Sequence, residues 1–235
     1  MNELNNFISI VIPIYNESES IDSLVQEVIN VMKINKLYFE LILVNDGSID
    51  STLKILNDLS LKVKELKVIN LRKNYGQTAA MAAGFDYSNG EIIITLDGDL
   101  QNDPNDIPKL IEHIKSGYDL VCGWRFDRKD RLINRRIPSK IANKLIGYVT
   151  GINLHDYGCS LKAFKKEIVK DMKLYGELHR FLPVLANIEG AKIKEIKVNH
   201  RQRKFGNSKY GIDRTFRVLM DLLTVWFMNK FLTRP

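Results

Sequence analysis

Short apolar runs alternate with longer amphipathic stretches through the first half of the chain. Apolar runs of about four to eight residues between polar turns predict buried strands, and apolar residues spaced three and four apart predict helices. We predict strands at 7–14, 39–46, 66–71, 91–97 and 118–123, with helices at 18–34, 51–59, 77–88 and 107–117. Strands that are apolar on both faces must be covered on both, so this alternation predicts an α/β fold with a Rossmann-like, doubly wound and mostly parallel sheet.

The second half of the chain is less regular. It has a basic amphipathic stretch at 137–151, a helical stretch near 177–189, a strand at 192–200, and a long apolar and basic helix from about 212 to 232. We interpret residues 1–210 as one domain and residues 211–235 as an amphipathic helix that follows it.

Composition excludes several classes of protein. The 235 residues include only Cys122 and Cys159, too few for a disulfide scaffold or a Cys-rich zinc site. No secretory signal opens the chain, and no window holds the roughly 18 consecutive apolar residues of a membrane span. We therefore expect a soluble or peripheral intracellular protein. The chain also lacks a P-loop, a dinucleotide fingerprint, a nucleophile elbow and an H-E-x-x-H zinc motif.

The net charge of +7 is unevenly distributed. Residues 125–150 contain eight Lys and Arg against two Asp, and residues 192–217 contain nine against one Glu and one Asp. A solvated basic face is one interpretation. Two dense clusters on an otherwise acidic chain favour an anionic partner instead, such as phosphate groups, anionic lipid or nucleic acid.

Functional groups follow all five predicted strands of the first half. They are Tyr15, Asn16 and Glu17; Asn45, Asp46 and Ser48; Arg72, Lys73, Asn74 and Gln77; Asp97, Asp99 and Gln101; and Trp124 and Arg125. In a doubly wound fold, ligands bind beyond the carboxyl ends of the strands. A single Asp-Gly pair usually marks only a turn. Polar and charged side chains after five strands, all on the same side of the sheet, predict a binding site.

The segment DGDLQ is the centre of this site. Asp97 and Asp99 are separated by one residue, so they point the same way where the backbone stays extended. Such a pair repels itself unless a cation lies nearby, and oxygen ligands, with the amide of Gln101 as a further one, favour Mg²⁺ or Mn²⁺. A helix-capping loop is the alternative, but capping accounts for Asp103 and not for the other two carboxylates.

Several motifs together resemble a known family. IPIYNE, VNDGSID, NYGQTAAMAAG and LDGDLQNDP, in this order, resemble the inverting family 2 glycosyltransferases with the GT-A fold. CGWRF, DYGCSLKAFKKE, GELHRFLP and RQRKFGNSKYG are similar to the polyprenyl-phosphate glycosyltransferases, the group of dolichol-phosphate mannose synthase and the GtrB-type glucosyltransferases. The resemblance extends from about residue 8 to residue 235.

The resemblance implies roles for individual residues. The nucleoside would be lined by Pro13, Tyr15, Glu17 and Asp46, with Asp46 facing the base and Gln77 closing over it. The cation on the diphosphate would be held by Asp97, Asp99 and Gln101. Phosphates of donor or acceptor would be contacted by Arg125, Arg203, Ser208 and Lys209.

The acceptor side is implied less directly. Asp156 matches an acidic position near the reacting groups, where it would act as a base or would orient an Arg or Lys. A lipid phosphate is already anionic at neutral pH, so a strong base is not required. The first basic cluster supplies Arg128, Arg131 and Arg135 as candidates for binding the acceptor phosphate.

The expected activity is metal-dependent, inverting transfer of a hexose from a nucleotide sugar to a polyprenyl phosphate at the cytoplasmic face of the membrane. GELHRFLP favours glucose and a UDP donor. The resemblance implies no nucleic-acid partner and allows a homo-oligomer. Two alternatives stay open: a glycosyltransferase for a saccharide or other small acceptor, and a nucleotide-sugar-binding scaffold without turnover.

Members of this group commonly continue past an Arg-Pro pair like Arg234-Pro235 into transmembrane helices. Residues 211–235 would then be a juxtamembrane helix. Trp226, Phe227 and Phe231, with basic neighbours, suit a helix lying on a bilayer surface. An oligomer interface or a place in the core is the alternative.

Overall fold

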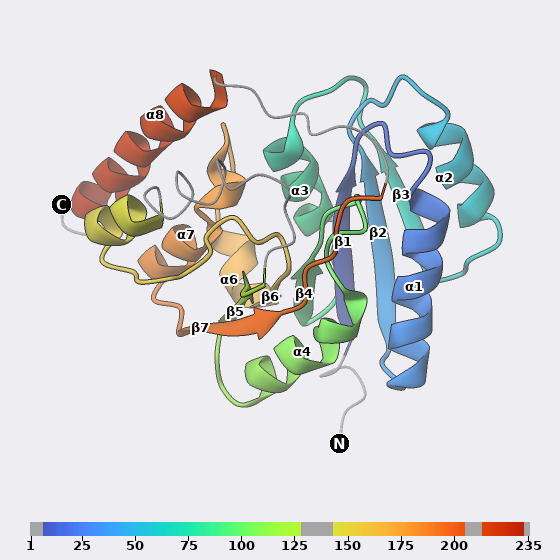
Figure 1. Ribbon diagram of the computed structural model, residues 1–235, viewed down its shortest axis with the longest axis horizontal. Helices are drawn as coiled ribbons and strands as arrows, with labels where there is room; N and C mark the ends of the chain where they lie inside the picture. Colours follow the sequence, from blue (N-terminus) through green and yellow to red (C-terminus); the bar gives the residue numbers. More distant parts are fainter. Residues whose placement is uncertain (1–6, 128–142, 205–212, 233–235) are drawn as a thin grey trace.

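The computed structural model describes residues 7–127, 143–204 and 213–232. Seven strands form one sheet in the order β3-β2-β1-β4-β6-β5-β7 (Figure 1). The strands are β1 (Ile8–Ile14), β2 (Phe39–Asn45), β3 (Leu66–Asn70), β4 (Ile92–Thr95), β5 (Leu120–Arg125), β6 (Lys162–Lys165) and β7 (Ile193–Val198). The predicted α/β fold with a doubly wound, mostly parallel sheet is confirmed.

Helices cover both faces of this sheet (Figure 1). The α-helices are α1 (Ile21–Ile34), α2 (Thr52–Ser60), α3 (Gln77–Asp86), α4 (Ile107–Lys115), α6 (Lys166–Asp171), α7 (Leu182–Ile188) and α8 (Asp213–Phe227). Residues 143–150 are also helical. Shorter elements are the 3₁₀ turns η2 (Pro104–Asp106) and η3 (Leu178–Arg180) and a π-helical turn η4 (Met228–Leu232).

Alternate residues of each strand enter different cores. Ile10 and Ile12 of β1 pack with α1, α2 and α4 on one face, whereas Val11 between them packs with α3 and α6 on the other. Each of these three side chains is 0% exposed. Because the central strands are buried on both faces, their sequences are apolar at nearly every position, which is the pattern that predicted the fold.

Strand β6 was not predicted from the sequence. It lies antiparallel between β4 and β5, pairing Ile93 with Phe164 on one side and Val121 with Ala163 on the other. Its four residues include two lysines, so no apolar run marks it. Lys162 is nevertheless buried, because its ammonium group bonds to the backbone carbonyls of Tyr157 and Cys159.

A third apolar cluster joins the second-half helices. Tyr157 and Phe181 pack there with Leu222 and Val225 of α8, so this part of α8 belongs to the core. The other side of α8 stays exposed at Leu223, Trp226 and Phe227, among others. None of the helices in the described ranges is both long and apolar enough to cross a bilayer.

Near the amino-terminal ends of the strands, Glu40 of β2 connects β1, β3 and the loop before β4. Its buried carboxylate accepts bonds from the Ser9 hydroxyl at 2.5 Å, the Lys67 ammonium at 2.5 Å and the Asn89 backbone N–H at 2.7 Å. Burial alone would raise the pKa of Glu40, but these bonds to the charged form lower it below its usual value.

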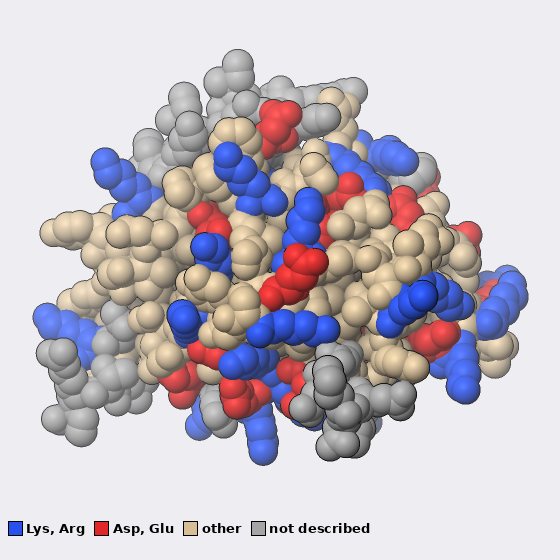
Figure 2. Space-filling view, turned by 90° about the horizontal axis from the view of Figure 1, so that it is seen from below, with Lys and Arg blue, Asp and Glu red and all other residues tan. Residues whose placement is uncertain are grey.

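Charged side chains of both signs are mixed on the underside of the molecule (Figure 2). Within the second basic cluster, Arg201 pairs with Glu27 and Asp103, and Arg203 pairs with Asp99. The local excess of basic residues along the chain is therefore partly neutralised by acids from elsewhere, and these two arginines do not form a free basic surface.

Candidate active site

The carboxyl ends of the parallel strands meet at the upper edge of the sheet in Figure 1, and the loops that follow them form the candidate site. Two of these loops touch at Gly47, where φ is +63°. A Cβ at this position would lie 2.3 Å from the backbone carbon of Lys73, so only glycine allows the loops after β2 and β3 to meet so closely.

Asp46, at the end of β2, holds the loop after β3. Its carboxylate accepts the backbone N–H of Tyr75 at 2.7 Å and of Gly76 at 2.9 Å. The side chain is 3% exposed; burial raises the pKa of Asp46, while the two N–H bonds oppose that rise. The predicted contact of Asp46 with the nucleotide base would therefore have to form alongside these two hydrogen bonds or replace them.

The other predicted nucleoside residues lie at the end of β1. Pro13, Tyr15 and Glu17 are all partly exposed at the same edge as Asp46. The backbone N–H of Glu17 bonds to the Thr52 hydroxyl at 3.0 Å, which ties this turn to the start of α2.

The DGDLQ segment turns sharply rather than staying extended. Turn geometry begins at Gly98, and Leu100 has a left-handed φ of 60° although it is a buried leucine. Such a conformation costs on the order of 1 kcal/mol and is typical of functional sites. The premise of an extended backbone was therefore wrong, but the turn still keeps both carboxylates close enough for Asp97 to raise the pKa of Asp99.

Each of the two aspartates already has a partner. Asp97 accepts a bond from the Gln77 amide at 2.9 Å, so Gln77 reaches the acidic segment itself. Asp99 accepts the Arg203 guanidinium at 2.5 Å and the backbone N–H of Gln101 at 3.1 Å. The side-chain oxygen of Gln101 lies 3.4 Å from the same Arg203 nitrogen.

The Asp99 carboxyl has an unusually high pKa, about 6. Burial is the largest cause, the charge of Asp97 is the next, and Glu17 adds to both, whereas Arg203 and the Gln101 N–H oppose the rise. The bonds from Arg203 and Gln101 therefore do not outweigh burial and the like charges of Asp97 and Glu17.

The donor set fits a hard divalent cation in its chemistry. Two carboxylates and one amide oxygen are ligands that Mg²⁺ and Mn²⁺ accept, and a cation would relieve the repulsion between the charges of Asp97 and Asp99. Among the described residues no three His, Cys, Asp or Glu side chains gather as a ready metal cage.

Arg125, at the end of β5, is locked to Asp156. Its Nε lies 2.7 Å from Oδ2 and its Nη2 lies 2.8 Å from Oδ1. Burial alone would lower the pKa of Arg125, but the bonds to Asp156 raise it above its usual range, with Asp97 contributing from nearby. Of the two predicted roles for Asp156, this contact favours the orienting role.

Sequence reasoning missed the residue that supports Asp156. Glu195 of β7 accepts the backbone N–H groups of His155 at 3.1 Å and Asp156 at 2.9 Å, and its Oε2 lies 2.7 Å from the His155 ring nitrogen. A lone glutamate in the basic strand KIKEIKV carried no signal except that it is the one acid there.

A second missed contact joins the GELHRFLP motif to α3. The Thr78 hydroxyl lies 2.7 Å from the Nδ1 of His179 in η3. Thr78 follows Gln77 directly, so this contact fixes the start of α3 beside the acidic segment. The GELHRFLP motif was visible in the sequence, but the sequence did not indicate that its histidine contacts Thr78.

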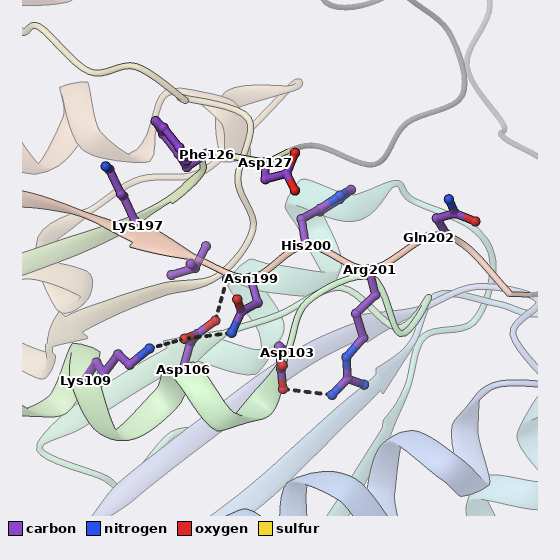
Figure 3. Close-up of a pocket in the computed structure, with 11 residues that line it drawn as sticks. Asp103, Asp106, Lys109, Phe126, Asp127, Lys197, Asn199, His200, Arg201 and Gln202 are labelled. Carbon is purple, nitrogen blue, oxygen red and sulfur yellow. Dashed lines mark hydrogen bonds and ion pairs between the residues drawn. The ribbon is translucent and has the colours of Figure 1, made fainter.

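The segment after β7 crosses the acidic loop. Asn102 and His200 form an isolated antiparallel bridge, and the backbone N–H of Arg201 bonds to the Gln101 carbonyl at 2.8 Å. Figure 3 shows the anchors beside it, Asp106 bonded to Asn199 and Asp103 bonded to Arg201. A cavity of about 750 Å³ lies along this segment, lined by acidic and basic residues, Phe126 and Asn199.

Five of the predicted site residues lie outside the described residues. They are Arg128, Arg131 and Arg135 of the first basic cluster, and Ser208 and Lys209 of the second.

Comparison with known proteins places these observations in a wider context. A family model described as glycosyl transferase family 2 matches residues 9–173. Dodecaprenyl-phosphate galacturonate synthase of Rhizobium johnstonii is 48% identical over 234 residues, which cover 97% of this chain and 69% of that protein. Undecaprenyl-phosphate 4-deoxy-4-formamido-L-arabinose transferase of Photorhabdus laumondii is 43% identical over 218 residues, 92% of this chain and 67% of that protein.

Solved structures share the fold at lower identity. Glucosyl-3-phosphoglycerate synthase from Mycobacterium tuberculosis, in complex with Mn²⁺, UDP and phosphoglyceric acid, has a TM-score of 0.70 at 17% identity, covering 95% of this chain and 78% of that one. TarS of S. aureus in complex with UDP-GlcNAc has a TM-score of 0.66 at 19% identity, covering 94% of this chain and 66% of that one. At such identities the likeness concerns the fold alone.

Proposed function

Because the chain belongs to glycosyl transferase family 2, we propose that it transfers a sugar from a nucleotide sugar to a polyprenyl phosphate, with inversion at the sugar carbon. The resemblance found in the sequence motifs is confirmed, and the chain is a glycosyltransferase. Its relatives are named for dodecaprenyl and undecaprenyl phosphate, which supports a lipid phosphate as acceptor here.

One arrangement carries this proposal. The carboxylates of Asp97 and Asp99 and the guanidinium groups of Arg125 and Arg203 converge at the carboxyl ends of β4 and β5. Transfer of a sugar away from a diphosphate needs positive charge around the leaving group, and acidic residues nearby can hold the cation that supplies part of it.

Asp97, Asp99 and Gln101 would hold Mg²⁺ or Mn²⁺ on the donor diphosphate. The bound cation would stabilise the negative charge that grows on the diphosphate as the sugar bond breaks. Arg203 would add a guanidinium beside the same phosphates, and Gln77, which contacts Asp97, would close over the nucleoside.

The chemical step needs no strong base. An oxygen of the acceptor phosphate forms the new bond to the sugar carbon, and the diphosphate leaves with the electron pair of the bond that breaks. The acceptor oxygen is already anionic, so no proton has to be removed from it. The two-bond contact of Asp156 with Arg125 supports this scheme over transfer to a saccharide hydroxyl, which would require a free carboxylate base.

Further assignments belong to this proposal. Pro13, Tyr15, Glu17 and Asp46 would line the nucleoside, and Ser208, Lys209, Arg128, Arg131 and Arg135 would contact phosphates. A UDP donor and glucose remain the sequence-based predictions. The relatives are named for galacturonate and 4-deoxy-4-formamido-L-arabinose, so the sugar differs among similar chains.

We also propose that residues 1–210 form the catalytic domain and that residues 211–235 place it on the membrane. The exposed apolar side chains of α8 support this division, since an aqueous surface gives them no apolar cover.

A donor screen tests the proposed function. The protein would be incubated with undecaprenyl phosphate, Mn²⁺ and, separately, UDP-glucose, UDP-galacturonate and a GDP-sugar, and lipid-linked product would be scored by mass spectrometry. We expect product with one UDP-sugar and none after chelation of the metal. Transfer to a soluble saccharide acceptor, with no lipid-linked product from any donor, would overturn the choice of acceptor.

A further inference from the structure

Arg203 contacts two of the three side chains proposed to hold the cation. One nitrogen, Nη2, lies 2.5 Å from Oδ2 of Asp99 and 3.4 Å from Oε1 of Gln101. A guanidinium nitrogen and a divalent cation cannot occupy the same place between two oxygens. A cation that binds between Oδ2 of Asp99 and Oε1 of Gln101 therefore requires that Arg203 leave them.

We propose that Arg203 is an internal counter-ion that occupies the cation position while no donor is bound and passes to the donor diphosphate when cation and donor bind together. This inference rests on the proposed function, because it takes the nucleotide-sugar diphosphate as the second partner of Arg203.

The chain just before Arg203 is held in place by bonds of Arg201 to the acidic loop and to the elements beside it. The Arg201 N–H bonds to the carbonyl of Gln101, and the Gln101 amide lies 3.4 Å from the carbonyl of Arg201. The Arg201 guanidinium bonds to Glu27 at 2.5 Å and to Asp103 at 2.8 Å, the second contact being visible in Figure 3. These anchors do not involve Arg203, so its side chain can exchange partners while the segment stays in place.

Arg125, Arg201 and Arg203 are held to different degrees. Arg125 makes two bonds to one carboxylate, and Arg201 bridges two carboxylates from separate elements. In the part of the chain that the structure describes, Arg203 contacts Asp99 and Gln101 through a single nitrogen, and its side chain is 23% exposed. Fork-to-fork pairs are the stronger and more specific ones, so Arg203 is the arginine most easily exchanged.

A thermodynamic consequence follows for binding. A cation that binds alone must displace Arg203 and leave its charge without a partner, whereas a diphosphate that arrives with the cation gives Arg203 a new one. Cation and donor should then assist each other's binding, and such couplings typically change affinity about 5–150-fold.

The test measures Mn²⁺ binding without turnover, by electron paramagnetic resonance of free Mn²⁺ and by calorimetry, in the absence and presence of saturating UDP. Arg203→Met removes the guanidinium and keeps much of the apolar stem. Lys204→Met is the matched control, since Lys204 is the exposed neighbour on the same segment. Circular dichroism checks that each variant is folded, and Arg203→Gln serves as a second variant.

We expect Arg203→Met to bind Mn²⁺ alone at least about 5-fold more tightly than the wild type and to lose most of the benefit that UDP confers. Lys204→Met should behave like the wild type. Unchanged or weaker Mn²⁺ binding by both Arg203 variants, with UDP still assisting, would overturn the counter-ion role. A wild type that binds no Mn²⁺ even with UDP would instead overturn the metal site of the proposed function, and this inference with it.

Discussion

Arg125 and Asp156 face each other through two parallel N–H···O bonds, and the backbone N–H of Arg125 lies 3.3 Å from the same carboxylate. The aspartate is 3% exposed. Its position therefore depends on the arginine, and the arginine's orientation toward the edge of the sheet depends on it. This contact therefore favours a role for Asp156 in orienting Arg125 over a role as a base.

Asp156→Asn should expose this dependence. Removing one partner of a buried pair costs roughly 3–5 kcal/mol of stability, and the loss should be strongly non-additive with Arg125→Gln. Urea denaturation of the two single variants and the double variant measures the coupling. For activity, adding Asp156→Asn to Arg125→Gln should lower kcat little further. A multiplied loss of kcat in the double variant would show that Asp156 has a second role, such as that of a base.

Asp99→Ala should abolish the Mn²⁺-dependent part of UDP binding while the fold persists, because Asp99 supplies a carboxylate to the proposed cation. Calorimetry with UDP, with and without Mn²⁺, measures this directly. Asp127→Ala is the control, because Asp127 is an exposed acid that lines the cavity and is not one of the proposed cation ligands. Equal UDP affinity in the wild type and Asp99→Ala would remove Asp99 from the metal site.

Glu40 predicts a pH dependence of stability. Its folded pKa lies below the usual 4.5, so its contribution is complete above that value and is lost as the pH falls through the folded pKa. Glu40→Gln should lower the free energy of unfolding by roughly 1–3 kcal/mol at pH 7, and the difference from the wild type should shrink below about pH 4. Urea denaturation at several pH values measures it.

The control for Glu40 is Glu65→Gln. Glu65 meets Lys33 only at 4.0 Å on the surface, so its loss should change stability by well under about 1 kcal/mol. A difference between wild type and Glu40→Gln that stays constant from pH 7 to pH 3 would contradict the role assigned to the charged carboxylate.

The exposed face of α8 should bind anionic bilayers. Trp226 and Phe227 are 38% and 57% exposed, and Lys230 lies over the Trp226 ring at 5.2 Å. We expect the protein to float with vesicles containing anionic lipid, to be partly released by high salt, and to bind at least several-fold more weakly after Trp226→Ser with Phe227→Ser.

Tyr87→Ser, which removes an aromatic side chain 65% exposed at the end of α3, should leave this flotation unchanged. If the α8 variants float as well as the wild type, or the wild type ignores such vesicles at low salt, the face would instead be a protein interface. Analytical ultracentrifugation would then report its self-association.

The sequence predicted the features that depend on local pattern. Strands β1, β2 and β4 are apolar at nearly every position, and the polar residues that follow each apolar run mark the carboxyl end of the strand. The acidic pair at Asp97 and Asp99 was visible for the same reason, since both lie within four residues of the end of β4.

The contacts that complete the site were not visible. Arg203 and Asp99 are 104 residues apart, and Glu195 and Asp156 are 39 apart. Contacts between residues so far apart in the sequence produce no periodic pattern, because either partner, seen alone in the sequence, is an ordinary charged residue. The second basic cluster shows the same limit, since the acids that pair with Arg201 and Arg203 lie in other parts of the chain.

The place of β6 in the sheet has a consequence for how the chain folds as it is synthesised. Strands β1 to β4 can pair with one another as soon as residue 95 has been made. Strand β5, complete at Arg125, pairs with β6, which begins only at Lys162, and with β7, which begins only at Ile193. On the ribosome one edge of β5 would therefore stay open until β6 has been made, and the other until β7 is complete at Val198. The part that contains β1 to β4 can be native while the part that carries Arg125 is still vulnerable to aggregation and to chaperone capture.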